Sequence, residues 1–153
     1  MQLIIDIFPI RVDYMKSNKE IEREQNVIII SNTEIIKLLD YNKYNQYRID
    51  MPYKIMPRVY NPYKIMSIYS IKNSNDSVGI GELICLKYND AESLKKIFAI
   101  LNALYNFMPK TITTDFDKAQ IKALKLCSNF INKLYIIILC FINPIQILNI
   151  LTF

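Results

Sequence analysis

The chain has 153 residues, of which 52% are hydrophobic and 22% are charged, so it is long and apolar enough for one domain with a sizeable core. It contains no His, which excludes imidazole general bases, Ser-His and Cys-His dyads and most zinc sites, and leaves carboxylates as the main candidates for chemistry. The net charge is +5, and six bases against the single acid Asp50 between residues 41 and 75 account for that excess.

Two further features of the composition narrow the class of protein. With only 2 Gly, the chain has no Gly-rich phosphate loop and no dinucleotide fingerprint, so we expect no nucleotide cofactor. Cys85, Cys127 and Cys140 are widely spaced, and each lies in an apolar run, which predicts buried thiols in a reducing compartment.

Residues 1–40 are expected to form a lead-in segment before the main sheet. The apolar run at its start is too short and too acidic for a signal peptide, so we expect an intracellular protein. Residues 17–26 are polar and charged, and Val27–Ile30 then predicts a short buried strand. Ser31–Glu34 is typical of the N-cap of a short helix through Leu39.

Residues 41–142 carry the main alternation of strands and helices. Three runs rich in Ile, Tyr and Val, at 44–54, 64–72 and 79–88, predict an antiparallel three-strand meander. A helix should begin at Asp90 and end before Pro109, with these apolar residues at spacings of three and four: Leu94, Ile97, Phe98, Leu101, Leu104 and Met108. A strand at 111–114, a helix at 116–129 and a strand at 135–141 should then follow, with parallel pairing. We therefore expect an α/β fold with a mixed sheet of about five strands.

Asp50 and Asp115 are the candidate catalytic and metal-binding residues. Each ends a strand-like run, and two convergent carboxylates are the minimum for a divalent-metal site. Other interpretations remain open. Asp115 could cap the helix starting at Phe116, or Thr114 could do so with Asp117 completing a capping box, and Asp50 could be a charge at a strand edge. Asp117 itself is expected to face solvent.

The basic window between residues 41 and 75 is also rich in Tyr. Interleaved bases and aromatic rings suit phosphate neutralisation and base stacking, so DNA is the expected partner. The candidate contacts are Arg48, Lys54, Arg58 and Lys64. The alternative is a solvated face of the sheet, because Tyr favours strands and Lys often flanks them.

Two segments resemble the catalytic domain of Mutator-like (MULE) transposases. Ile49–Lys54 (IDMPYK) resembles that family's first-aspartate segment, and Thr113–Ala119 (TTDFDKA) resembles its second. The resemblance, from about Val27 to about Gln146, implies an RNase H-like fold whose first and fourth strands lie side by side, which would place Asp50 beside Asp115. It also implies DNA cleavage and strand transfer with Mg²⁺ or Mn²⁺, and a location in the nucleus.

The chain departs from the family at three points. Pro52 stands where the family has Thr, and Asn143 stands where a Cys-x-x-His pattern would place His. No Asp or Glu follows Asp117, so the third carboxylate of the family's triad has no counterpart. The resemblance therefore predicts a truncated domain that is weakly active or inactive, with DNA binding without catalysis as the alternative.

Residues 134–153 carry no charge, so a membrane tether is a further alternative. The uninterrupted apolar run covers only 134–142, which is the length of a strand, and polar residues and Pro144 interrupt the rest. We expect a strand followed by an apolar tail at 143–153. Exposure of this segment would promote self-association.

Overall fold

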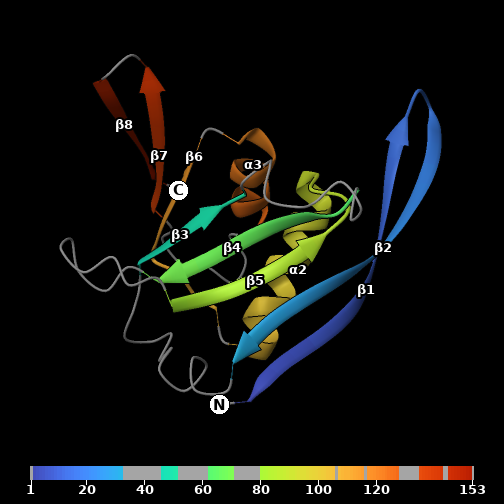
Figure 1. Cartoon of the computed structure of the whole chain (residues 1–153). Coiled ribbons are helices and arrows are strands. Elements are labelled where there is room, and N and C mark those ends of the chain that lie inside the picture. Colours follow the sequence, from blue (N-terminus) through green and yellow to red (C-terminus); the bar gives the residue numbers. More distant parts are fainter. Residues whose placement is uncertain are drawn as a thin grey trace.

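A computed structural model describes residues 2–32, 46–51, 62–70, 80–105, 107–115, 117–127, 135–142 and 145–152. In chain order the elements are β1 (Leu3–Lys16), β2 (Lys19–Asn32), β3 (Gln46–Asp50), β4 (Lys64–Ser70), β5 (Ile80–Leu86), α2 (Ala91–Tyr105), β6 (Thr111–Asp115), α3 (Lys118–Leu126), β7 (Tyr135–Ile142) and β8 (Ile145–Thr152). Figure 1 shows α2 behind the central strands and the β1–β2 hairpin extending away from the body of the sheet.

The described strands form one mixed sheet of eight strands in the order β1-β2-β5-β4-β3-β6-β7-β8. The pairs β3–β6 and β6–β7 are parallel, and the other neighbouring strands are antiparallel. The predicted α/β class, the meander of β3, β4 and β5, and the alternation of α2, β6, α3 and β7 are confirmed. The prediction of about five strands was too low, because β1 and β2 extend one edge of the sheet and β8 extends the other.

The N-terminal segment is part of the sheet, which corrects the expected lead-in segment. β1 and β2 are each 14 residues long and pair along their whole length, and Ile28–Ile30 pair with Leu83–Cys85 of β5. Ser17 and Asn18 connect the two strands with φ of 51° and 61°, the backbone geometry of a tight two-residue hairpin turn. The charged side chains at 19–26 are compatible with a strand because most of them are exposed on the hairpin. Ser31, expected at a helix N-cap, lies in β2, and the predicted helix through Leu39 falls outside the described residues.

The C-terminal segment also differs from the expected tail. Residues 145–152 form β8, which pairs antiparallel with β7 from Tyr135↔Thr152 to Ile142↔Ile145. Gln146 and Asn149, two of the polar residues that interrupt the apolar run, therefore belong to a strand. Among the helices of the described residues, none is long and apolar enough to cross a membrane.

The core lies between the helices and one face of the sheet. Alternate strand residues point into it, including Ile29, Ile49, Met66, Ile84 and Ile112, all at most 1% exposed. From α2 come Leu94, Ile97, Phe98 and Leu101, as predicted.

The end of α2 departs from the predicted apolar stripe. Leu104 and Met108, predicted to be buried, are 54% and 43% exposed. Tyr105 is buried instead, and its hydroxyl donates a 2.8 Å hydrogen bond to Oδ2 of Asp6 on β1. Desolvation, together with the Asp6 carboxylate, raises the pKa of Tyr105 above its ordinary value. The Tyr105 ring therefore points inward, because the Asp6 carboxylate on β1 accepts a hydrogen bond from its hydroxyl.

The opposite face of the sheet is apolar over β1, β2 and β5. Leu3, Ile5 and Ile7 alternate along β1 and are 56–61% exposed, and Leu83 of β5 is 46% exposed. Ile30 pairs with both Ile5 and Leu83, so these side chains form a continuous ladder across three strands.

The cysteines follow the prediction in part. Cys127 is buried and Cys85 is half-buried, and both are free thiols. Burial raises the pKa of Cys85 and raises that of Cys127 to about 11. The side chain of Cys140 lies outside the described part of the chain.

Candidate metal centre at the ends of β3 and β6

Asp50 and Asp115 end two neighbouring parallel strands. The pairing of β3 with β6 joins Gln46 to Thr111 and Arg48 to Thr113, a constant offset of 65 residues, and the same offset leads from Asp50 to Asp115. The pairing itself ends at Arg48 and Thr113, and the same register extended by two residues brings Asp50 level with Asp115 at the carboxyl ends of the strands. The expected adjacency of these strands is confirmed.

Both aspartates also point to the same face of the sheet. Tyr47 and Ile49 are buried against the helices, which turns Arg48 and Asp50 to the opposite face. In β6, Ile112 and Thr114 are buried, so Asp115 shares the face of Asp50. Tyr47 fixes this orientation, since its ring meets that of Phe107 edge to face at 5.1 Å between centroids.

Asp117, and neither Asp115 nor Thr114, caps the following helix. Its Oδ1 accepts hydrogen bonds from the backbone N–H groups of Ala119 at 2.8 Å and Gln120 at 3.0 Å. The alternative capping interpretations were wrong because α3 begins at Lys118, two residues later than predicted, so Asp117 occupies the N-cap position. Thr114 is buried and donates its hydroxyl hydrogen to Oε1 of Gln120. Asp115 therefore does not serve as the N-cap.

The electrostatic surroundings of Asp115 disfavour its ionised form. Desolvation, the negative charge of Asp117 and that of Asp50 together raise the pKa of Asp115 above its ordinary value. Like charges that converge without a counterion disfavour ionisation, and a divalent cation between them would reverse that effect. The contribution of Asp50 to this shift is consistent with the strand pairing that brings the ends of β3 and β6 together.

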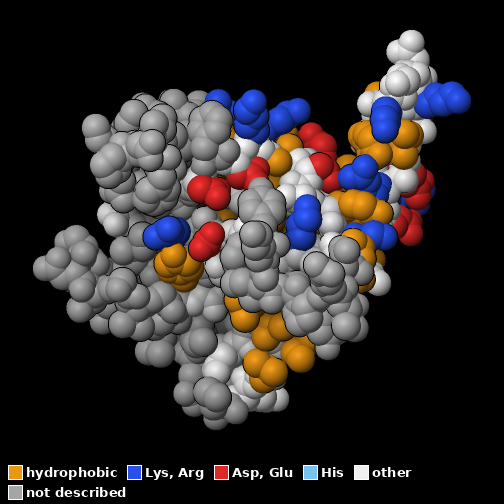
Figure 2. All heavy atoms as spheres, turned by 45° about the horizontal axis from the view of Figure 1, so that its top comes forward, with side chains coloured by type: hydrophobic (Ala, Val, Ile, Leu, Met, Phe, Trp, Pro, Cys, Tyr) orange, Lys and Arg blue, Asp and Glu red, His pale blue; other side chains and the backbone are white. Residues whose placement is uncertain are grey.

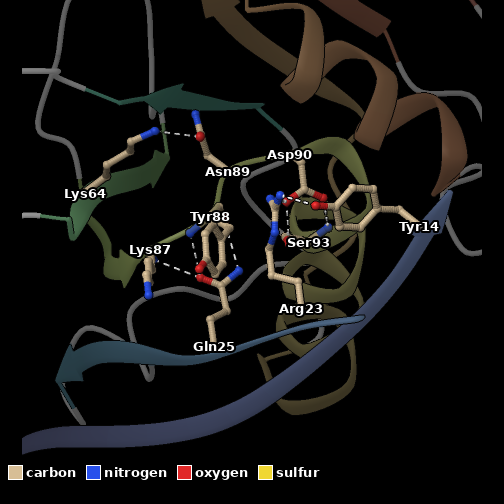
Figure 3. Close-up of polar contacts among 9 residues, drawn as sticks. All are labelled: Tyr14, Arg23, Gln25, Lys64, Lys87, Tyr88, Asn89, Asp90 and Ser93. Carbon is tan, nitrogen blue, oxygen red and sulfur yellow. Dashed lines mark hydrogen bonds and ion pairs between the residues drawn. The ribbon is translucent and has the colours of Figure 1, made fainter. Parts of the chain in front are cut away.

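Neutral and basic groups surround the end of β3. The Ser67 hydroxyl donates to the backbone oxygen of Asp50 at 3.3 Å, and Asn89 Nδ2 lies 3.5 Å from Sδ of Met51. Lys64 Nζ donates to Asn89 Oδ1 at 2.7 Å, as Figure 3 shows. Because β4 is antiparallel to β3, its first residue Lys64 lies at the edge where β3 ends.

The four predicted DNA contacts divide into two groups. Arg48 is half-buried on the same face as Asp50 and precedes it by two residues, and Lys64 lies at the same edge. Lys54 and Arg58 lie outside the described residues. Of the four predicted contacts, the two that the structure describes therefore lie on β3 and β4, the two strands that pair at the end of β3.

A polar cluster that the sequence did not predict connects the hairpin to the same edge of the sheet (Figure 3). The guanidinium of Arg23 lies between the rings of Tyr14 and Tyr88, at 4.7 and 4.3 Å from their centroids, and reaches Asp90 Oδ2 at 3.4 Å. Asp90 in turn accepts from the backbone N–H of Ser93 at 3.0 Å, which caps α2. Arg23 therefore fastens β2 to the start of α2.

Gln25 makes the second connection between β2 and the end of β5. Its Oε1 accepts from the N–H groups of Lys87 and Tyr88, each at 2.9 Å, and its Nε2 donates to the Tyr88 carbonyl at 2.9 Å. The side chain replaces the strand pairing that ends at Cys85. These partners are more than 60 residues from Gln25 in the sequence, so no local pattern indicated them.

The donor set fits one hard cation but does not form a complete cage. Among the described residues, no group of three or more His, Cys, Asp or Glu side chains is placed to hold a metal ion. Mg²⁺ keeps several waters and commonly takes one or two protein carboxylates together with substrate phosphates. Asp50 and Asp115 are compatible with that mode of binding. Comparison of the chain with family models, with curated proteins and with solved structures finds no match.

Proposed function

We propose that this chain is an RNase H-like domain related to Mutator-like transposases, in which Asp50 and Asp115 bind Mg²⁺ or Mn²⁺ and cleave DNA weakly. The observation that carries the proposal is the parallel pairing of β3 with β6, two adjacent strands whose last residues are Asp50 and Asp115. The strand order β5-β4-β3-β6-β7 supports the RNase H-like assignment, because it has a meander of three strands followed by two parallel strands.

The residues of the chain have distinct parts in this reaction. Asp50 and Asp115 would hold the cation, which when bound polarises the phosphodiester and lowers the pKa of a bound water. Arg48, on the same face, offsets the charge of the phosphate. Asp117 holds the start of α3 and adds negative charge beside Asp115. With only Asp50 and Asp115 proposed as metal ligands, we expect slow hydrolysis and inefficient strand transfer.

Metal binding tests the site without depending on activity. Mn²⁺ binding, followed by the loss of the free-ion electron paramagnetic resonance signal, should weaken at least tenfold in Asp50→Asn and in Asp115→Asn. Asp13→Asn removes the same charge from an exposed position of β1 and should bind Mn²⁺ like the unchanged protein. Equal Mn²⁺ affinity in all four proteins would refute the metal site.

Nicking of supercoiled plasmid tests the reaction. The unchanged protein should convert plasmid to open circles with Mg²⁺ or Mn²⁺ and not with EDTA, and both aspartate variants should lose this activity. Metal binding and salt-sensitive DNA binding without any nicking would favour the non-catalytic DNA-binding alternative.

A further inference from the structure

The surface of α3 carries a stripe of lysines that the proposed metal site does not use. Lys118, Lys122 and Lys125 are exposed, while Gln120, Ala123 and Leu124 are buried on the opposite side of the helix. Spacings of four and three residues place the three lysines on one side. The helix itself contains no Asp or Glu. All the charges on its outer face are therefore positive.

The position of α3 relates this stripe to the carboxylate pair. The helix begins directly after its cap Asp117, close to the end of β6, and Cys127 at its far end lies 4.0 Å from the carbonyl oxygen of Lys95 in α2. α2 starts shortly after the end of β5, at the edge where β3 and β6 also end. α3 thus begins at the edge of the sheet where β3 and β6 end with Asp50 and Asp115. α3 lies at the top of Figure 1, and in Figure 2, where the top comes forward, basic side chains gather along the upper margin above a group of acidic ones.

We propose that Lys118, Lys122 and Lys125 bind successive phosphates of a DNA strand and lead it to the Asp50–Asp115 pair. From Lys118 to Lys125 the helix rises about 10 Å, at 1.5 Å per residue. One strand of DNA advances about 3.4 Å along the duplex axis per phosphate, so the stripe spans about three phosphates. Like charges four residues apart destabilise an isolated helix, and a polyanion on the stripe would offset that repulsion.

The partner named here follows from the proposed function, on which this inference rests. A row of lysines alone would accept any polyanion, whereas the neighbouring carboxylates repel phosphates unless a cation is bound. A phosphodiester strand that passes from the lysines to a metal site would place its negative phosphates beside the positive lysines and beside the bound cation. Because the lysines contact only phosphates, they should bind DNA of any sequence.

The test measures the salt dependence of binding to a fluorescein-labelled 20-base-pair DNA duplex in EDTA, so that cleavage cannot contribute. A triple variant with Lys118, Lys122 and Lys125 changed to Gln should lower the slope of log K against log salt by about three, or about one for each phosphate that a lysine no longer neutralises. The matched control changes Lys16, Lys19 and Lys110 to Gln, which are exposed away from α3, and should leave the slope within about one of its original value. Equal reductions in the two triple variants would overturn the proposal.

A second measurement uses the unchanged protein and does not depend on how a variant folds. DNA should protect the three α3 lysines from acetylation, as read by mass spectrometry, while Lys16, Lys19 and Lys110 remain reactive. Absence of protection, or binding of a heparin oligosaccharide as tight as that of DNA, would overturn the proposal. Protection of the α3 lysines in a protein that does not nick plasmid would support the DNA surface and refute the proposed catalysis. Nicking of plasmid without protection of the α3 lysines would support the proposed catalysis and refute the DNA surface on α3.

Discussion

The N-cap at Asp117 gives the sharpest test of how the site is built. In Asp117→Ala, the backbone N–H groups of Ala119 and Gln120 lose the oxygen that accepts from them at 2.8 and 3.0 Å. Loss of such a cap costs about 1 kcal/mol, within a range of about 0.5–2. For a chain of this size, that corresponds to a decrease of about 2–4 °C in Tm.

Asp117→Asn keeps the side-chain oxygen that caps α3 but removes the negative charge. The Asn carbonyl can still accept both hydrogen bonds, so its stability should stay close to that of the unchanged protein. Both substitutions remove the negative charge that raises the pKa of Asp115, so the pKa of Asp115 should fall in both. The two variants should therefore differ in stability and agree in the titration of Asp115.

Urea denaturation followed by circular dichroism measures the free energy of unfolding, and carboxyl NMR measures the titration of Asp115. Asp13→Ala, at an exposed position of β1, is the control for loss of an aspartate without loss of a cap. If Asp117→Asn destabilised the protein as much as Asp117→Ala, the charge and not the cap would be responsible. If neither changed stability, α3 would not begin where the structure places it.

Two further predictions concern pH and backbone packing. The pKa of Asp115 is raised above the ordinary value of 3.8, so the folded state binds the Asp115 proton more tightly than the unfolded state does. Ionisation of Asp115 therefore destabilises the fold, and this loss of stability is complete once the pH exceeds the folded-state pKa. Asp115→Asn should therefore raise the free energy of unfolding at pH 7, and this gain should disappear as the pH falls through the folded-state pKa to below 3.8. Gly81→Ala should destabilise by about 3 kcal/mol or more, since a Cβ there would lie 1.6 Å from the carbonyl oxygen of Ile68 and would force β4 and β5 apart.

The controls for these two predictions are simple. For Asp115→Asn, an equal gain in stability at pH 7 and at low pH would show that the charge is not the cause. For Gly81→Ala, the comparison is Ala99→Gly at an exposed position of α2, where the reverse change should cost only about 0.5–1 kcal/mol. Near-normal stability of Gly81→Ala would contradict the close approach of the two strands.

The local pattern of the sequence was sufficient for the type and order of the central elements. Alternating apolar residues and breakers located β3, β4 and β5, and apolar residues at spacings of three and four located α2. The strand-like runs that lead to Asp50 and Asp115 also predicted strand ends there, which the structure confirms, although the meander pattern at 44–54 extended past Asp50. The type and order of these elements depend on neighbours within a few residues, so the sequence alone was sufficient to predict them.

Only the tertiary structure decided how distant segments meet. The pairing of β3 with β6 over an offset of 65 residues sets the two aspartates level, and the pairing of β2 with β5 brings the N-terminal hairpin into the sheet. Likewise, α3 begins at Lys118, so Asp117 occupies its N-cap position. β8 pairs antiparallel with β7, so residues 145–152 form a strand. Register and capping depend on which hydrogen bonds and buried side chains can be satisfied together, and local periodicity does not carry that information.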